Sequence, residues 1–308
     1  PRVRRQRQMC IRDSNYISLC TNQSIAAILP NDKYDSLYLY YVVDSKYDYL
    51  RLLSSGDGGR GGLNKNLLNS LEIVFPKTIA EQRAIAEALS DIDGLIAALD
   101  KKIAKKRLIK QGAMQQLLTG KKRLPGFTDS WVEKKLGEIL DYEQPQPYLV
   151  VSTDYVDSGI PVLTAGKSRI LGYTTEQFGI YNKLPVIIFD DFTTDSKYIS
   201  YPFKVKSSAM KVLSLKNNDY DLRLVYELMQ QIDFPLKDHQ RYWISEYSQL
   251  TISIPKDREE QTAIATILTD MDKEIADLEA KRDKYSLLKS GMMQKLLTGQ
   301  IRLKINRI

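Results

Sequence analysis

The chain has 308 residues, of which 43% are hydrophobic and 27% are charged. This length and composition predict a folded protein with room for two domains, and they exclude bulk disorder. No apolar run approaches the roughly 18 residues that cross a bilayer, so we expect no membrane association. Two cysteines and one histidine leave neither a disulfide framework nor a histidine-rich metal site, which is typical of a cytoplasmic protein.

The net charge of +7 is concentrated at the start of the chain. Residues 1–14 contain five arginines and one aspartate, which is about +4 of the total, so the remainder is only mildly basic. One interpretation is a basic arm for nucleic acid. We favour foreign sequence, because Met9–Ser14 resembles a translated adapter sequence. We therefore expect 1–14 to be a non-native tail and the native sequence, starting near Asn15, to lack part of its N-terminus.

The segment 15–70 has the pattern of the last part of a domain. A strand-like Ile17–Ile28 is followed by a helix-like Leu37–Val43 and then by a loop. The glycine-rich stretch 56–62 lacks the lysine and hydroxyl residues of a phosphate-binding loop, so we interpret it as a plain loop.

A gapless internal repeat is the strongest signal in the sequence. Leu71–Leu124 aligns with Leu250–Leu303 at a constant offset of 250 − 71 = 179 residues, and about half of the aligned positions are identical. Each copy opens with a β-prone run that a proline ends, at Leu71–Phe75 and Leu250–Ile254. Each copy then predicts one helix of about 40 residues, several times the usual length.

Residues at the ends of the two predicted helices suit their positions. Glu81 and Glu260 lie near the starts, where a carboxylate interacts favourably with the helix dipole. Gly120 and Gly299 follow the last apolar residues, as glycines that end helices do. The domain boundaries that we expect are 1–14, 15–70, 71–124, 125–249 and 250–308.

Apolar residues in both predicted helices recur at alternating spacings of four and three, the pattern of a coiled-coil seam. Four basic residues, Lys106, Lys110, Arg282 and Lys289, interrupt it. The helices could instead be two separate amphipathic helices, each packed on a globular core. We favour an antiparallel coiled coil within the chain, with the intervening domain as the connection. The seam residues are Ile85, Leu89, Ile92, Ile96, Leu99, Ile103, Ile264, Leu268, Met271, Ile275, Leu278, Tyr285, Met292 and Leu296.

The interval 125–249 predicts a separate α+β domain. Tyr148–Val151, Ile160–Leu163 and Pro185–Phe189 are short β-prone runs separated by glycines. Asp221–Ile232 has apolar residues on one helical face. The fold class is therefore α+β, with mixed α/β domains separated by two long helices.

Several motifs together resemble one known family. They are Pro76…Glu81-Gln82…Ala84-Ile85-Ala86, the run Met114-Gln115-Gln116-Leu117-Leu118-Thr119-Gly120-Lys121-Lys122-Arg123-Leu124, the second copies of both, and the stretches 164–173 and 185–193. From Asn15 onward the chain resembles the specificity subunit of type I restriction-modification systems. It departs from the family at the front, where most of the first recognition domain is absent.

The resemblance implies a non-catalytic subunit that reads DNA. Each target recognition domain would read one half of a bipartite, asymmetric site in double-stranded DNA, and the two helices would set the distance between the half-sites. Two methylation subunits would dock on the helices, carry S-adenosylmethionine and methylate adenine. Separate restriction subunits would supply ATP- and Mg-dependent translocation and cleavage, so no cofactor is expected in this chain.

Loops of the second recognition domain supply the candidate DNA contacts. Arginine can pair with guanine and glutamine with adenine, while lysine suits phosphates and aromatic rings suit stacking. The candidates are Lys167, Ser168, Arg169, Tyr173, Gln177, Lys197, Tyr198, Lys206, Lys211, Gln240, Arg241 and Tyr242.

Two other classes of function remain open. A stand-alone DNA-modifying enzyme with coiled-coil arms would need a catalytic site, and Asp190, Asp191, Asp195 and Lys197 are the residues that could hold a nuclease metal. Their spacing is poor for that, and it favours a turn or capping role. A coiled-coil scaffold with no nucleic-acid role is the other class, and DNA affinity that falls with salt would exclude it.

Overall fold

The computed structural model describes residues 27–54, 65–164, 170–236 and 241–303. The chain divides into two compact units, one of residues 1–105 with 275–308 (unit 1) and one of residues 106–274 (unit 2). Most of the strand expected at Ile17–Ile28 and the glycine-rich stretch 56–62 lie outside the described residues.

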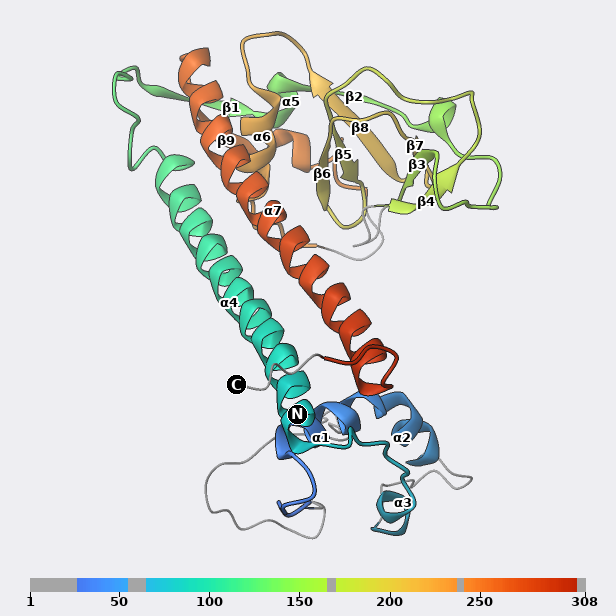
Figure 1. The fold of residues 1–308 in the computed structure, drawn as a ribbon. Helices are drawn as coiled ribbons and strands as arrows, with labels where there is room; N and C mark the ends of the chain where they lie inside the picture. Colours follow the sequence, from blue (N-terminus) through green and yellow to red (C-terminus); the bar gives the residue numbers. More distant parts are fainter. Residues whose placement is uncertain (1–26, 55–64, 165–169, 237–240, 304–308) are drawn as a thin grey trace, which may run out of the picture. The chain divides into compact units, whose positions relative to one another are not determined.

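Two long helices contribute to both units (Figure 1). Helix α4 spans Ile79–Leu117 and helix α7 spans Arg258–Leu297, with 39 and 40 residues. These lengths confirm the prediction from the repeat. Gly120 and Gly299 follow the helices with φ of 67° and 73°, the left-handed region that glycine adopts without steric cost.

The helices pair antiparallel, and the basic residues that interrupt the seam form ion pairs across it. In unit 1 the N-terminal part of α4 lies beside the C-terminal part of α7, where Lys289 Nζ is 2.6 Å from Asp93 Oδ1. In unit 2 the order is reversed, and Lys110 Nζ is 2.5 Å from Asp272 Oδ1. The repeat offset of 179 relates these two pairs, because Asp93 corresponds to Asp272 and Lys110 to Lys289.

The seam side chains are covered to different degrees. Eight are buried: Ile85, Leu89, Ile92, Ile103, Ile264, Leu268, Ile275 and Leu296. The other six are half-buried: Ile96, Leu99, Met271, Leu278, Tyr285 and Met292.

Leu89→Ala is expected to lower the free energy of unfolding by about 2–5 kcal/mol, because it leaves a cavity among buried side chains. Leu89 is fully buried in the core of unit 1. The matched control is Leu108→Ala on the same helix, since Leu108 is 68% exposed and its truncation should change stability by no more than about 0.5 kcal/mol. Urea unfolding followed by helical ellipticity measures both. Equal effects of the two substitutions would contradict the burial of Leu89.

The part of unit 1 that the structure describes adds three short helices: α1 (Ser36–Ser45), α2 (Tyr47–Ser54) and α3 (Lys65–Asn69). Helix α1 confirms the helix expected at Leu37–Val43, and the Asp35 side chain caps it by accepting a hydrogen bond from Tyr38 N. The core of this unit joins α1 to both long helices. Its buried residues are Tyr38, Tyr41, Val42, Ile85, Ala86, Leu89, Leu296 and Leu297.

The strand predicted at Leu71–Phe75 is absent, and this prediction was wrong. The segment has no strand assignment, whereas its repeat copy forms strand β9 (Thr251–Pro255). In unit 2, β9 pairs antiparallel with β1 (Trp131–Lys135). Within the described part of unit 1 no strand pairs with Leu71–Phe75, so the ladder that defines a strand cannot form.

The described residues of unit 2 form three sheets, with strand orders β1-β9, β2-β8-β5-β6 and β4-β3-β7. Figure 1 shows the four-stranded sheet between helix α6 and the three-stranded sheet. The remaining elements in chain order are α5 (Leu136–Ile139), β2 (Leu140–Glu143), η1 (Gln146–Tyr148), β3 (Ile160–Leu163), β4 (Ile170–Thr174), β5 (Val186–Asp190), β6 (Ser196–Ile199), β7 (Lys204–Val205), β8 (Met210–Leu215), α6 (Leu222–Met229) and η2 (Tyr247–Gln249).

The four-stranded sheet is covered on both faces. Ile187 and Phe189 of β5 join a core with α6 and the ends of the long helices. Val186 and Ile188, which point the other way, join a second core with the three-stranded sheet. Both faces of β5 are therefore buried, which explains its continuous apolar sequence.

Most elements predicted for 125–249 are present. Strands β3 and β5 and helix α6 confirm three of the four predictions. The strand expected at Tyr148–Val151 was wrong, because its start lies in the 3₁₀ helix η1 and only Leu149 makes an isolated bridge. Pro145 and Pro147 lie just before Tyr148 and lack the backbone N–H groups that a β-ladder needs.

Candidate nucleic-acid interface

One end of the four-stranded sheet gathers the loops that carry several candidate DNA contacts. Strand β5 ends at Asp190, while β6 begins at Ser196 and β8 begins at Met210. Because β5 is antiparallel to both neighbours, these three positions lie at the same end. The turns 191–195 and 206–209 therefore project from one edge of the domain.

Asp190 shapes the first of these turns. Its carboxylate accepts hydrogen bonds from Phe192 N at 3.0 Å and from Thr193 Oγ1 at 2.8 Å, and its carbonyl accepts from Thr194 N. Thr194 has a φ of 58°, which the turn holds against its usual steric cost. These bonds fit the turn role that the sequence favoured over a nuclease metal site.

Asp191 joins three separate segments at a buried point. Its backbone N–H donates to Ala209 O, and its carbonyl accepts from Tyr242 N. Its carboxylate accepts from Trp243 N at 2.8 Å and lies 3.4 Å from Lys211 Nζ. The side chains of Asp191 and Lys211 are 2% and 1% exposed. We call Asp191 and these partners the Asp191 anchor, and it fixes the turn 191–195, the loop 206–209 and the segment 241–243 against one another.

Arg241 is an exposed cation that the Asp191 anchor positions. Its guanidinium carbon lies 5.8 Å from the centre of the Phe192 ring, within the range of a cation–π contact. Phe192 is itself 44% exposed at the tip of the turn. The pair therefore presents a forked hydrogen-bond donor next to a stacking surface, the two groups that read bases in DNA.

Two lysines lie near the end of strand β3. Lys197 Nζ donates to Thr164 O at 3.0 Å, and Lys206 N donates to Leu163 O at 2.9 Å, while the Lys206 side chain is exposed. The exposed ammonium of Lys206 suits a phosphate contact.

The other described candidates lie at various depths. Gln177 is exposed and donates to Thr175 O, and Tyr173 is half-buried on β4. Tyr198 is half-buried, with the Arg223 guanidinium carbon 5.1 Å from its ring centre, and burial raises the pKa of its hydroxyl. Only Gln177 of these three offers a free surface for DNA.

Two candidates do not belong to a DNA-binding surface. Lys211 is buried, with its ammonium bound to Asp191 and to Gln144 Oε1 at 2.9 Å. Tyr242 is 0% exposed and packs in the core beside Phe234. The sequence showed the residue types of Lys211 and Tyr242 but not that both are buried. Four further candidates, Lys167, Ser168, Arg169 and Gln240, lie outside the described residues.

Phe192 is a surface residue that the candidate set omitted. A large apolar residue after the acidic pair Asp190-Asp191, in a turn rich in threonine, was the available signal. An apolar side chain at a turn tip gains nothing from water, so it indicates a contact surface.

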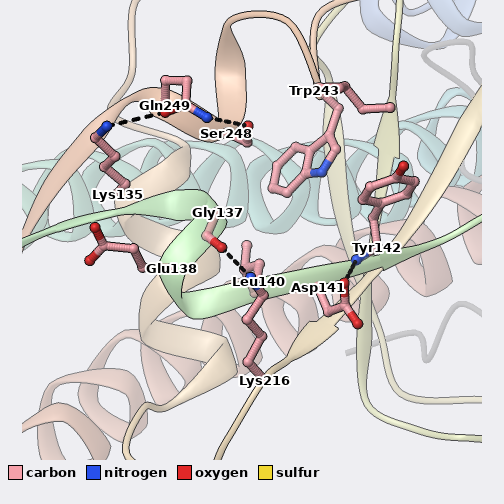
Figure 2. Close-up of a pocket in the computed structure, with 11 residues that line it drawn as sticks. Lys135, Gly137, Glu138, Leu140, Asp141, Tyr142, Lys216, Trp243, Ser248 and Gln249 are labelled. Carbon is pink, nitrogen blue, oxygen red and sulfur yellow. Dashed lines mark hydrogen bonds between the residues drawn. The ribbon is translucent and has the colours of Figure 1, made fainter.

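A separate hollow in unit 2 lies at the other end of β2 and β8. Figure 2 shows Lys135, Glu138, Asp141 and Lys216 around it, with Trp243 at one side. Lys135 Nζ donates to Gln249 Oε1, and Lys216 Nζ donates to Gly137 O. The two positive and two negative side chains around this hollow offset each other, so it does not attract a polyanion such as DNA.

The described residues contain no group of three or more His, Cys, Asp or Glu side chains placed to hold a metal ion. None of the helices among these residues combines the length and apolar character that spanning a bilayer requires.

Comparison with known proteins shows the family. A model of the type I restriction modification DNA specificity domain matches residues 8–106 and 128–285. The two matched stretches cover most of the chain, and each holds one recognition segment with much of the long helix that follows it. The chain therefore belongs to the family of type I restriction modification DNA specificity domains.

Named relatives agree with this family. The chain is 51% identical over 148 residues to the EcoR124I/EcoR124II specificity subunit of Escherichia coli, an alignment that covers 46% of this chain and 36% of that protein. It is 24% identical over 318 residues to the MjaVIII specificity subunit of Methanocaldococcus jannaschii, covering 88% of this chain and 71% of that one. The first alignment thus spans little more than a third of the E. coli subunit.

A solved structure shares the fold. The crystal structure of a type I restriction-modification S subunit from M. genitalium superposes with a TM-score of 0.67 at 17% identity. The match covers 89% of this chain and 74% of the other. At this identity the likeness concerns the fold alone.

Proposed function

We propose that this chain is a DNA-recognition subunit of a type I restriction-modification complex. Its recognition domain, 125–249, reads one half of a bipartite site in double-stranded DNA. The paired helices set the distance to the other half-site and dock the methylation subunits. The observation that carries the proposal is the Asp191 anchor, which holds the exposed Phe192, Lys206 and Arg241 at one end of a rigid sheet.

The geometry suits recognition rather than a reaction. A site that reads bases needs hydrogen-bond donors and aromatic rings on loops that a rigid scaffold holds in place. Arg241 and Phe192 meet this requirement, because buried backbone hydrogen bonds fix the segments on which they lie. The chain catalyses nothing itself in this proposal.

The partners follow from the same proposal. Two methylation subunits supply S-adenosylmethionine and the adenine methylation, and restriction subunits supply ATP- and Mg-dependent translocation and cleavage. All of them act on DNA in the cytoplasm. The exposed faces of the paired helices are the surfaces on which the methylation subunits would dock.

Methylome sequencing tests the proposal. The gene is expressed with its neighbouring methylation subunit, and a new methyladenine motif with two fixed halves and a fixed gap is expected. Replacing 127–249 with the same segment of a relative should change one half of the motif and leave the other half and the gap intact. If the assembled complex produced no new motif, sequence-directed recognition would be ruled out.

Lys206→Ala is expected to weaken binding to all DNA sequences about equally and to lower the slope of log K against log salt by about 1, because one phosphate contact is lost. Arg241→Ala should instead relax the choice of base at one position, by about 1–3 kcal/mol. Lys216→Ala is the matched control, since Lys216 is an exposed lysine just beyond the opposite end of β8. Fluorescence anisotropy of the assembled complex over a salt series measures all three. Equal slopes for Lys206→Ala and Lys216→Ala would contradict the assignment of Lys206.

A further inference from the structure

A buried glutamine of each long helix holds the first turn of a shorter helix. In unit 2 the side-chain oxygen of Gln261 accepts a hydrogen bond of 2.8 Å from Asp221 N, the N-cap of α6. Its Nε2 donates to Pro255 O, also at 2.8 Å. In unit 1 the corresponding Gln82 accepts from Asp35 N, the N-cap of α1, at 2.8 Å. The two glutamines are 0% and 2% exposed, and we call this contact the glutamine clamp.

A second contact lies further along α6, at the ion pair of the seam. In unit 2 this pair is Lys110 with Asp272. Arg223 Nη2 of α6 donates to Asp272 Oδ2 at 2.6 Å and lies 2.7 Å from Glu227 Oε1. Glu227 Oε2 lies 3.9 Å from Lys110 Nζ, and the Glu227 side chain is 2% exposed. Two positive and two negative side chains therefore form one neutral cluster that joins α6 to both long helices.

Unit 1 makes the second contact with a different side chain. Its ion pair is Lys289 with Asp93, and Tyr41 of α1 meets it. The Tyr41 hydroxyl donates to Asp93 Oδ2 at 2.8 Å, and Lys289 Nζ lies 5.4 Å from the centre of the ring. Tyr41 and Glu227 are each the sixth residue after their N-cap, since 41 − 35 = 227 − 221 = 6. The long helices thus keep both contact points, while the helix that they hold supplies different side chains.

Two contact points restrict a helix more than one does. A helix held only at its N-cap can swing about that point, and apolar packing has no direction of its own. Six residues span about 9 Å along a helix, so a second contact at that distance opposes the swing. Hydrogen bonds weaken steeply when they lengthen or bend. A buried charged cluster need not be more stable than apolar side chains of similar volume, but its bonds specify an orientation that apolar side chains would not.

In unit 2 the held helix is connected to the candidate DNA contacts. Gln230, which follows the last turn of α6, donates from Nε2 to Ser196 Oγ at 2.7 Å. Ser196 begins β6 directly after the turn 191–195. The guanidinium carbon of Arg223 also lies 5.1 Å from the ring centre of Tyr198 on β6. The orientation of α6 on the long helices therefore decides where this turn points.

We propose that Gln261 and the Lys110–Asp272 pair are positioning residues for DNA recognition. They hold the recognition domain 125–249 in one orientation on α4 and α7, and this orientation sets which gap between the half-sites the complex accepts. None of the three side chains needs to touch DNA. The inference rests on the proposed function and deepens it, because the length of the paired helices does not by itself determine the direction of the reading turns.

Removal of the whole ion pair tests the proposal. Lys110→Met combined with Asp272→Leu replaces both charges by apolar side chains and leaves Arg223 and Glu227 paired with each other. Such an exchange is often neutral or stabilising, so this double variant is expected to fold. Fluorescence anisotropy of the assembled complex measures affinity for DNA with the motif found by methylome sequencing, at the native gap and at gaps one base pair shorter and longer. The preference for the native gap is expected to fall by about tenfold, because the turns are no longer held at one angle.

A second variant and a matched control accompany the double variant. Gln261→Met removes the hydrogen bonds of the glutamine clamp at similar side-chain volume, and it should also lower the preference for the native gap. It decides the question if the double variant does not fold. The control is Lys106→Met with Glu274→Leu, which removes a 2.7 Å ion pair between the same two helices whose side chains are 32% and 45% exposed. The control should keep the preference of the unchanged complex.

Two results would overturn the proposal. The folded variants could prefer the native gap as strongly as the unchanged complex does. They could instead lose affinity equally at all three gaps, which is the result of a purely structural role. Failure of the proposed function gives a different result, because the unchanged complex would then prefer no sequence and no gap.

Discussion

Asp191→Ala is expected to lower the free energy of unfolding by about 3–5 kcal/mol, the range for removing one partner of a buried ion pair. The substitution leaves the Lys211 ammonium buried without its counter-charge. It also leaves the backbone N–H of Trp243 without its acceptor. The fluorescence of Trp243, which packs 5.2 Å from Phe189 between ring centres, reports the urea transition. The effect is large because both members of the pair are almost completely shielded from water.

Two further variants test the cause of this loss. Adding Lys211→Met to Asp191→Ala removes the unpaired charge and should recover part of the stability. Asp195→Ala is the matched control on the same turn, because its side chain is exposed and the change should be within about 0.5 kcal/mol. If Asp195→Ala were as costly as Asp191→Ala, the Asp191 anchor would not be the source of the effect.

Loss of the anchor is also expected to weaken DNA reading more than Arg241→Ala alone. The segment 241–243 and the turn 191–195 would no longer be held together, so both Arg241 and Phe192 would lose their positions. Asp191→Asn, which keeps an acceptor for Trp243 N but removes the charge, should give an intermediate loss. DNA affinity measured at a temperature where each variant is folded separates this effect from unfolding.

Glu260→Gln is expected to cost about 3 kcal/mol, the low end of the range for a broken buried pair. Glu260 is 0% exposed and accepts two hydrogen bonds of 2.7 Å from Arg123, whose side chain is 27% exposed. The repeat provides a matched comparison, because Glu81 corresponds to Glu260 and binds Arg302 in the same two-pronged way. The Glu81 side chain is 6% exposed but Arg302 is 60% exposed. Water therefore screens this pair on one side, and Glu81→Gln should cost less than Glu260→Gln.

The stability that the Glu81–Arg302 pair contributes should fall in acid. The hydrogen bonds from Arg302 hold the pKa of the Glu81 carboxyl below its usual value. The unfolded chain therefore binds this proton at a higher pH than the folded chain does, and the contribution to stability is complete above about pH 4.3 and lost as the pH falls through the folded pKa. Glu81→Gln should remove this acid-sensitive part. Hydrogen exchange of the first turns of α4 and α7 between pH 3 and 6 measures it, and a Glu81→Gln profile identical to that of the unchanged chain would contradict it.

The long helices, α6 and several strands could be predicted because their signals are local. Apolar spacing and the terminal Gly120 and Gly299 act within a few residues, and each is readable in order along the chain. The family resemblance had the same basis, since the repeated motifs lie on these helices. The antiparallel pairing followed from having two similar seams in one chain.

The candidate interface was only partly predictable. Lys206 and Lys211 are the same residue type, yet Lys206, in the loop before β8, is exposed and Lys211, on β8, is 1% exposed. Tyr242 and Arg241 are adjacent, and again only one reaches the surface. The difference arises because Asp191, some fifty residues from Arg241 along the chain, binds this segment.

The sequence by itself determined the repeat, the helices with their ends, and the family, because these rest on neighbouring residues. Only the tertiary structure decided which cations are free for DNA and which are buried partners of Asp191. It also decided that Leu250–Ile254 overlaps a strand while the similar Leu71–Phe75 does not. A strand exists only where another segment supplies its hydrogen bonds, and burial depends on what covers a side chain, so neither property is carried by the residue itself.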